Sequence, residues 1–142
     1  MKTTKIVYLD TNVYCRPLDD QSNSRIHKEA EAFLQIVDKA ERGRTEIVSS
    51  DYVKFEIEQI EDPSKRKNIQ SFERILSKTN VTPSKRLFSM AKEINVKCRL
   101  NALDALHSAA ACLGKASFLL TCDDKNFREH QLHRNTCCKE RV

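Results

Sequence analysis

The stretch IVYLDTNVY, residues 6–14, begins with an unbroken run of apolar and β-branched residues and stops on the carboxylate of Asp10. Such a run is typical of a strand that is buried on both faces in a parallel sheet. In open parallel sheets, ligands bind beyond the carboxyl ends of the strands. We therefore expect this strand to lie inside a sheet and to present Asp10 at its exposed end, just before Thr11 and Asn12.

The rest of the chain alternates between helical and strand patterns. Strand patterns occur in TEIVSS and SFLLT, residues 45–50 and 117–121. Apolar residues recur at helical spacing in residues 21–43, 50–61, 65–78 and 101–114. A further helix is expected to start at residues 82–84, with Leu87, Ala91 and Ile94 in register. Asp62 and Pro63 are expected to end the second of these helices. Because apolar strands separated by long helical connections pair in parallel, we expect one α/β domain over residues 1–142, with a polar tail from about residue 128.

Composition and charge limit the classes of function. A chain of 142 residues fits one domain, and 39% hydrophobic with 32% charged residues is typical of a folded globular protein. No apolar run is long enough to span a membrane or to form a signal-peptide core, so we expect a cytoplasmic protein without a membrane partner. The net charge of +5 modestly favours a polyanionic partner. With only two glycines, a glycine-rich phosphate loop is not expected.

Four carboxylates follow or interrupt apolar segments and form the candidate site. Each has an ordinary structural explanation, as a helix cap, as the partner of a lysine or on a solvated helix face. If the fold brings them together, two charges about 4 Å apart repel by about 4 kcal/mol at an effective dielectric near 20. A divalent cation offsets this repulsion, and Mg²⁺ or Mn²⁺ suits an all-carboxylate site better than Zn²⁺. The four residues are Asp10, Glu56, Asp104 and Asp123.

Four short motifs surround these carboxylates. They are LDTN at residues 9–12, the glutamate in SSDYVKFEIEQI, DALHSAAA at 104–111 and LLTCDDKNF at 119–127. In this order they resemble the motifs of PIN-domain ribonucleases, and most of all the compact toxins of VapC-type toxin–antitoxin pairs. The resemblance implies a single PIN-like domain in which helices flank a parallel sheet of four to five strands. It also implies an endoribonuclease that depends on Mg²⁺ or Mn²⁺.

The resemblance further implies roles for particular side chains. Asn12 and Thr121 match polar supporting positions of the family, which orient the carboxylates or the scissile phosphate. One or two metal ions activate a water molecule, which then hydrolyses an RNA phosphodiester bond. The metal-binding and catalytic acidic positions of the family are matched by Asp10, Glu56, Asp104 and Asp123.

Two of these assignments stay open, and one histidine needs an interpretation. Glu58 is an alternative to Glu56, although side chains two residues apart on a helix point about 200° away from each other. Asp124 is likewise an alternative to Asp123. His107 lies one helical turn beyond the aspartate of DALHSAAA and is a conceivable general base. We interpret it as a packing histidine with a satisfied ring nitrogen, because a metal-activated water does not require it.

The resemblance implies an RNA substrate and a cognate antitoxin protein as partners, and homodimerisation is usual in the family. Basic side chains that are expected to hold the RNA backbone are Arg16, Lys65, Arg66, Lys67, Lys85 and Arg86. The main competing interpretation is a catalytically inactive PIN-like module that binds RNA or protein. A phosphatase with an aspartyl nucleophile is a second alternative, but such enzymes need another aspartate where Asn12 stands.

Overall fold

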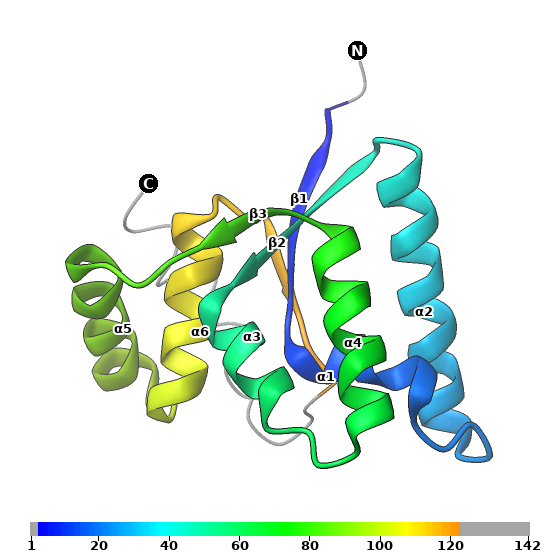
Figure 1. Cartoon of the computed structure of the whole chain (residues 1–142). Coiled ribbons are helices and arrows are strands. Elements are labelled where there is room, and N and C mark those ends of the chain that lie inside the picture. The colour runs from blue at the N-terminus through cyan, green and yellow to red at the C-terminus, as the bar shows by residue number, and fades with distance from the viewer. Residues whose placement is uncertain (1–2, 123–142) are drawn as a thin grey trace.

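A four-stranded parallel sheet forms the centre of the protein, whose computed structural model describes residues 3–122 (Figure 1). Neighbouring strands all pair in parallel, and their order is β3-β2-β1-β4. The strands are β1 (Lys5–Leu9), β2 (Thr45–Ser50), β3 (Ser77–Val81) and β4 (Phe118–Leu120). The predicted α/β fold with a parallel sheet of four to five strands is thus confirmed, with four strands in the described residues.

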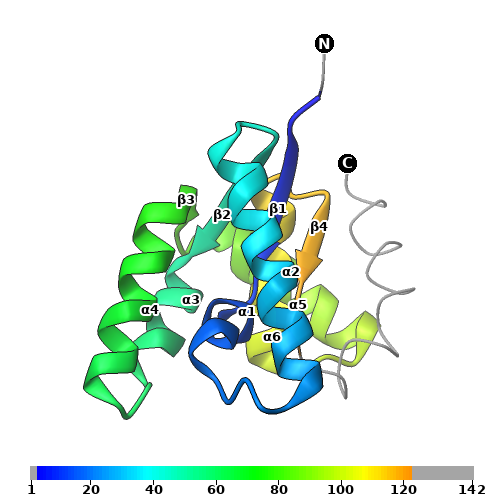
Figure 2. The same ribbon diagram turned by 90° about the vertical axis from the view of Figure 1, so that its right-hand side faces the viewer.

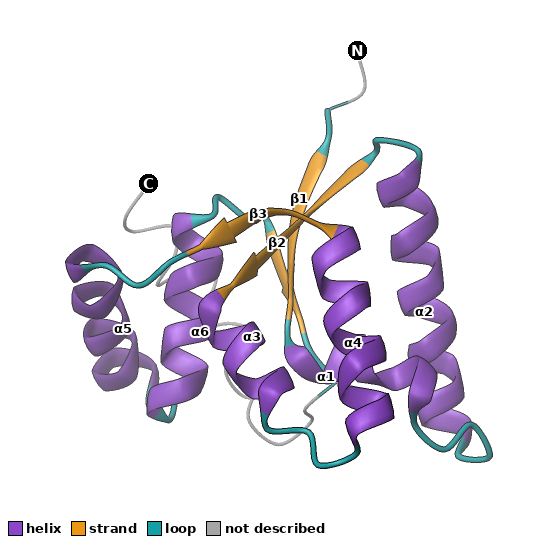
Figure 3. Cartoon of the chain, in the orientation of Figure 1, coloured by secondary structure: helices purple, strands orange, loops and turns teal. Residues whose placement is uncertain are grey.

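Helices cover both faces of this sheet (Figure 3). They are α1 (Thr11–Cys15), the 3₁₀ helix η1 (Arg16–Leu18), α2 (Ser24–Glu41), α3 (Asp51–Glu58), α4 (Pro63–Leu76), α5 (Lys85–Cys98) and α6 (Ala102–Leu113). Helices α2 and α4 lie on one side of the sheet, and α5 and α6 lie on the other (Figures 1 and 2). Among the described helices, none combines the length and the apolar character that a membrane span requires.

Capping residues explain where the helices begin. The Asn23 side chain accepts hydrogen bonds from backbone N–H groups in the first turn of α2. Asp62 does the same for α4, and Pro63 takes the first helical position, where no N–H group is needed. The prediction that Asp62 and Pro63 end a helix is therefore wrong. They begin α4 instead, and α3 already ends at Glu58.

The hydrophobic periodicity of the sequence does not predict two short elements, β3 and α1. Residues 77–81 form the strand β3 at the edge of the sheet, although the helical pattern over residues 65–78 predicts helix as far as Lys78. The sequence SKTNV is mostly polar, and its three central residues are exposed, so it shows no apolar alternation. Helix α1 begins directly after Asp10, and its five residues are too few to display a helical period.

Small side chains on α6 allow this helix to approach the rest of the core closely. Ala105, Ala109 and Ala110 are all at most 1% exposed and belong to the main hydrophobic core. Gly114 follows the last residue of α6, where a Cβ atom would lie 2.6 Å from Cγ1 of Val48 on β2. Glycine at this position therefore permits close packing of the helix end against the sheet. This packing fixes how α6 presents its other residues to the end of the sheet.

The strand order reverses between β1 and β4. The chain leaves β1 for β2 and β3 on one side and reaches β4 on the other side only later. Leu9 pairs with Leu120, and the N–H of Asp10 donates to the carbonyl of Leu120 over 2.9 Å. Ligands of open parallel sheets bind beside such a reversal, beyond the carboxyl ends of the strands. Asp10 and Thr121 follow directly after these two strands.

Candidate metal centre

Asp10 directly follows the last residue of β1, and its carboxylate caps α1. Its Oδ1 accepts from the N–H of Thr11 over 2.7 Å, and its Oδ2 accepts from the hydroxyl of Thr121 over 2.9 Å. The two contacts together fix the direction of the carboxylate, because each of its oxygens accepts from a different donor. The side chain is 10% exposed. Asp10 therefore has the location that the sequence predicts, at the open end of a buried strand.

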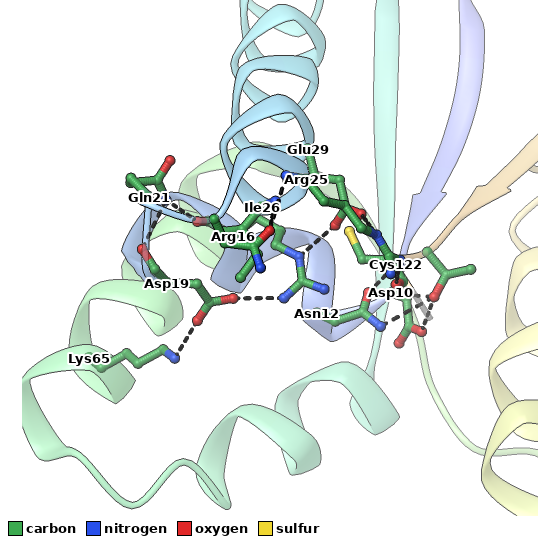
Figure 4. Close-up of polar contacts among 12 residues, drawn as sticks. Asp10, Asn12, Arg16, Asp19, Gln21, Arg25, Ile26, Glu29, Lys65 and Cys122 are labelled. Carbon is green, nitrogen blue, oxygen red and sulfur yellow. Dashed lines mark hydrogen bonds and ion pairs between the residues drawn. The ribbon is translucent and has the colours of Figure 1, made fainter. Parts of the chain in front are cut away.

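Asn12 and Thr121 also lie where a supporting role requires them. The amide of Asn12 donates to the Thr121 hydroxyl over 3.3 Å. The amide oxygen of Asn12 accepts from the N–H of Cys122 over 3.1 Å. Asn12 thus links the residues after β4 to α1 and lies near Asp10 and Cys122 (Figure 4). The Thr121 hydroxyl in turn donates to Asp10.

Glu56 reaches the same place from α3. This helix begins immediately after β2, where the Ser50 hydroxyl accepts from the N–H of Val53 and so caps it. Glu56 lies near the end of α3 and contacts Nε2 of His107 with its carboxylate. Glu58 is exposed on another face of the helix. Of the two glutamates, the structure brings Glu56 to Asp10 and His107.

His107 of α6 joins the two carboxylates. The residue as a whole is 1% exposed, and its Nδ1 lies 2.6 Å from the hydroxyl of Tyr8. Nε2 contacts Glu56 and lies 3.8 Å from Oδ1 of Asp10. The interpretation of His107 as a buried histidine with a satisfied ring nitrogen is therefore correct, but it is incomplete. Both nitrogens have partners, and one of these is a carboxylate of the site.

Asp10, Glu56 and His107 form a group that could hold a metal ion, because one ligand atom from each lies within 4.8 Å of the others. Within residues 3–122, no lysine or arginine pairs with either carboxylate, so the single imidazole is their only cationic neighbour there. Two carboxylate ligands with an adjacent imidazole fit a divalent cation such as Mg²⁺ or Mn²⁺. We name these three residues the metal centre.

Burial and the two carboxylates, which share one imidazole, shift the pKa values of the metal centre. Burial raises the pKa of Asp10; the His107 ring lowers it, the Glu56 charge raises it, and the net pKa lies above the usual value. Burial lowers the pKa of His107, but the hydrogen bond that its Nε2 donates to Glu56 and the charge of Asp10 outweigh burial, so that pKa is also raised. A cation bound between the carboxylates would favour the ionised form of Asp10.

The other two predicted acids are placed differently. Asp104 lies in the first turn of α6 and exchanges hydrogen bonds with Asn101, whose side chain caps this helix. Among the described residues, Asp104 is not part of the group within 4.8 Å, although its charge helps to raise the pKa of His107. Asp123, its alternative Asp124 and the polar tail lie outside the described residues.

A cluster of three cations and two carboxylates lies beside the metal centre (Figure 4). Arg16 donates to Asp19 over 2.8 Å and to Glu29 over 2.6 Å. Lys65 donates to Asp19 over 2.8 Å, and Arg25 donates to Glu29 over 2.6 Å. We call these five residues the charge network. Arg16 and Lys65 therefore join η1, α2 and α4, which is a structural role that their predicted contact with RNA does not include.

The acids of the charge network have pKa values below their usual range. Burial raises the pKa of Glu29, but hydrogen bonds from the Cys122 thiol, Arg16 and Arg25 outweigh burial and lower the pKa to about 2. Burial likewise raises the pKa of Asp19, and hydrogen bonds from Lys65 and Arg16 reverse the effect and lower it. These carboxylates stay ionised at neutral pH because their cations are built into the fold.

Sequence reasoning did not assign His107 and Tyr8 to the site. The spacing of His107 from Asp104, three residues on a helix, already indicates that both side chains lie on one face. Tyr8 gives no such signal, because a tyrosine inside an apolar strand reads as an ordinary core residue. The role of its hydroxyl depends on the fold, which places Ser50 and His107 within hydrogen-bond distance of it.

Comparisons with known proteins agree with this fold. Three solved structures each cover 88% of this chain with a TM-score of 0.58. They are FitAcB from Neisseria gonorrhoeae (16% identity, 93% of that chain covered), VapBC2 from Rickettsia felis bound to a DNA fragment from their promoter (15%, 92%), and FitAB bound to an IR36 DNA fragment (16%, 90%). A search of curated proteins finds no match. The PIN domain family model matches residues 7–131, and the chain therefore belongs to the PIN domain family.

Proposed function

We propose that this protein is a divalent-metal-dependent endoribonuclease that hydrolyses RNA phosphodiester bonds at the metal centre. The observation that carries the proposal is the convergence of Asp10 and Glu56 at the strand-order reversal, with no lysine or arginine partner in the described part of the chain. Membership of the PIN domain family supports the same conclusion. Mg²⁺ or Mn²⁺ is the cofactor that such oxygen ligands favour.

In this mechanism, each side chain has a defined task. Asp10 and Glu56 would hold the ion, and Asp104 and Asp123 would be the further acidic residues near it. Thr121 and Asn12 keep Asp10 in a fixed orientation through the hydrogen bonds described above. When bound, the divalent ion lowers the pKa of a water molecule and stabilises the negative charge that develops on the leaving oxygen. Cleavage leaves a 3′-hydroxyl and a 5′-phosphate.

The structural relatives support a proposal about the biological setting. VapBC2 and FitAB have been solved bound to DNA fragments. By analogy, we propose that this chain is the toxin of a toxin–antitoxin pair, that it acts in the cytoplasm and that a cognate antitoxin binds it. A homodimer is proposed on the same basis. The net charge of +5 supports an RNA substrate, because basic residues attract the phosphate backbone without reading its sequence.

Cleavage of a labelled RNA in the presence of Mg²⁺ or Mn²⁺ tests the proposed activity. We expect cleavage by the wild-type protein, its loss in EDTA and its recovery when metal is added back. The Asp10→Asn variant should be inactive yet folded. Asp19→Asn is the matched control, because it removes a carboxylate of the charge network and should leave cleavage intact. Binding of RNA without metal-dependent cleavage would instead identify an inactive binding module.

A further inference from the structure

We propose that His107 is a positioning residue, which holds the carboxylate of Glu56 toward Asp10 and is itself held by a buried chain of hydroxyl groups from Tyr8 to Ser50. The proposal rests on the proposed function, because it assigns His107 and Tyr8 a role in preparing the metal centre. Neither residue touches the reacting atoms in this account. They determine where one of the two carboxylates points.

The chain of contacts is continuous and buried. The Ser50 hydroxyl lies 2.7 Å from the hydroxyl of Tyr8, which lies 2.6 Å from Nδ1 of His107. Nε2, at the other side of the ring, contacts Glu56. Tyr8 and Ser50 have no measurable exposure, and the rings of Tyr8 and Tyr52 both make T-shaped contacts with the imidazole. The ring therefore has little freedom to rotate away from Glu56.

The hydrogens of this chain can be assigned consistently. The ionised Glu56 carboxylate only accepts hydrogen bonds, so Nε2 of His107 must donate. Nδ1 is satisfied by the Tyr8 hydroxyl in both states of the ring, since it accepts from this hydroxyl when neutral and donates to it when charged. Ser50 accepts from the N–H of Val53, and its hydroxyl can still donate to Tyr8 or accept from it. The arrangement thus holds His107 in one orientation without depending on its protonation.

The exposure of the three side chains indicates that His107 lies behind the ligands. Side-chain exposure rises from 2% for His107 to 10% for Asp10 and 29% for Glu56. An ion that arrives from solvent therefore meets the carboxylates first. In metal sites, hydrogen-bond partners of the ligands orient them, and their loss typically weakens metal binding roughly 10–100-fold.

The same serine connects this chain to the helix that carries Glu56. Ser50 is the last residue of β2 and caps α3, and Glu56 follows within that helix. One side chain thus anchors both the start of α3 and the far end of the contacts that reach Glu56 through His107. Glu56 is restrained from its backbone and from its carboxylate at once.

Titration of each variant with Mn²⁺, followed by the loss of the electron paramagnetic resonance signal of free Mn²⁺, tests this role. We expect His107→Ala to weaken Mn²⁺ binding roughly 10–100-fold and Tyr8→Phe to weaken it about tenfold. His107→Gln should recover much of the loss, because its amide can still donate to Glu56. Tyr14→Phe is the control, since Tyr14 is equally buried but its hydroxyl lies beside Ser49. Thermal unfolding confirms that each variant is folded.

The outcomes separate this role from the proposed function. If the wild-type protein binds no Mn²⁺, the proposed metal-dependent function fails and the positioning role falls with it. If the wild-type protein binds Mn²⁺ and cleaves RNA but folded Tyr8→Phe and His107→Ala bind the ion as tightly, only the positioning role fails. Pulsed resonance spectra should show no nitrogen coupling to the ion. A histidine coupling that disappears in His107→Gln would make His107 a ligand and overturn the proposal.

Discussion

The metal centre and the charge network lie next to each other, yet they neutralise their acids in different ways. Cys122 connects them, because its N–H donates to Asn12 and its carbonyl accepts from Arg25 over 2.8 Å. In the charge network, each carboxylate is paired with two cations, and its pKa is lowered. In the metal centre, Asp10 and Glu56 share one imidazole, and the pKa of Asp10 is raised.

This difference indicates which acids stabilise the fold and which remain available for a ligand. Asp19 and Glu29 already have partners of opposite charge, so an added cation gains little there. Within the described residues, Asp10 and Glu56 share only the His107 imidazole and have no lysine or arginine partner, so they gain most from a divalent ion. Residues of the same chemical type thus have opposite roles because of their neighbours.

The largest expected effect comes from replacing Glu56 of α3 by glutamine, with the same replacement at Glu58 as the control. Glu56→Gln should lower the rate of RNA cleavage on the order of 100-fold, because the loss of one metal ligand removes several kcal/mol of transition-state stabilisation. Glu58→Gln, on the exposed face of the same helix, should cleave at the wild-type rate. Initial rates at one metal concentration measure both. Equal rates for the two variants would place the site elsewhere.

A smaller effect is expected at Thr121, which restrains Asp10. Thr121→Val keeps the shape of the side chain but removes the hydroxyl that donates to Oδ2 of Asp10, and should lower the cleavage rate about tenfold. Thr121→Ser retains the hydroxyl and should stay near the wild-type rate. Rates for the pair at saturating metal measure the contribution of this hydrogen bond, and a fully active valine variant would show that Asp10 does not need it.

Neutralising an acid of the charge network and neutralising Asp10 should affect stability differently. At pH 7 and without metal, Asp19→Asn should lower the free energy of unfolding by about 1 kcal/mol, because the partly exposed ion pairs to Arg16 and Lys65 are lost. Asp10→Asn should not lower it, because the charge of Asp10 is unfavourably buried in the folded protein. Urea denaturation measures both. Greater destabilisation by Asp10→Asn would reverse the assignment of structural and functional acids.

The smallest effect concerns acid stability. The pKa of Glu29 falls from 4.5 to about 2 on folding, so its contribution is fully present above about pH 4.5 and is lost as the pH falls toward 2. Asp10 acts in the opposite direction, since its raised pKa favours the folded protein as the pH falls through that pKa. Glu29→Gln should reduce the acid-induced loss of stability by less than about 1 kcal/mol. Identical urea midpoints for both proteins across this pH range would remove Glu29 as a contributor.

Much of the fold can be predicted from the sequence, because the patterns that indicate a strand or a helix lie within short segments of the chain. The apolar run before Asp10, the strand TEIVSS and the alanine-rich helix that contains Asp104 all have the expected type. The strand β3 does not, because its polar residues form a strand only by pairing with β2. Similarly, Asp62 and Pro63 match either the end or the beginning of a helix until the neighbouring residues are placed.

The residues of the site likewise differ in whether their positions can be predicted from the sequence. The position of Asp10 follows from a strand pattern and a general rule about parallel sheets, so sequence alone places it correctly. The contact of Glu56 with His107 joins residues 51 positions apart and depends on how α3 packs against α6. The sequence also does not indicate the pairing of Arg16 in η1 with Glu29 in α2, which gives Arg16 a structural role in addition to its expected contact with RNA.

Calorimetric titration of Mn²⁺ into the protein without RNA tests the central claim most directly. We predict saturable binding by the wild-type protein and by Asp19→Asn, and loss of that binding in folded Asp10→Asn. Absence of binding to the wild-type protein, or equal binding by Asp10→Asn, would contradict the claim that the unbalanced acids of the metal centre hold a divalent ion.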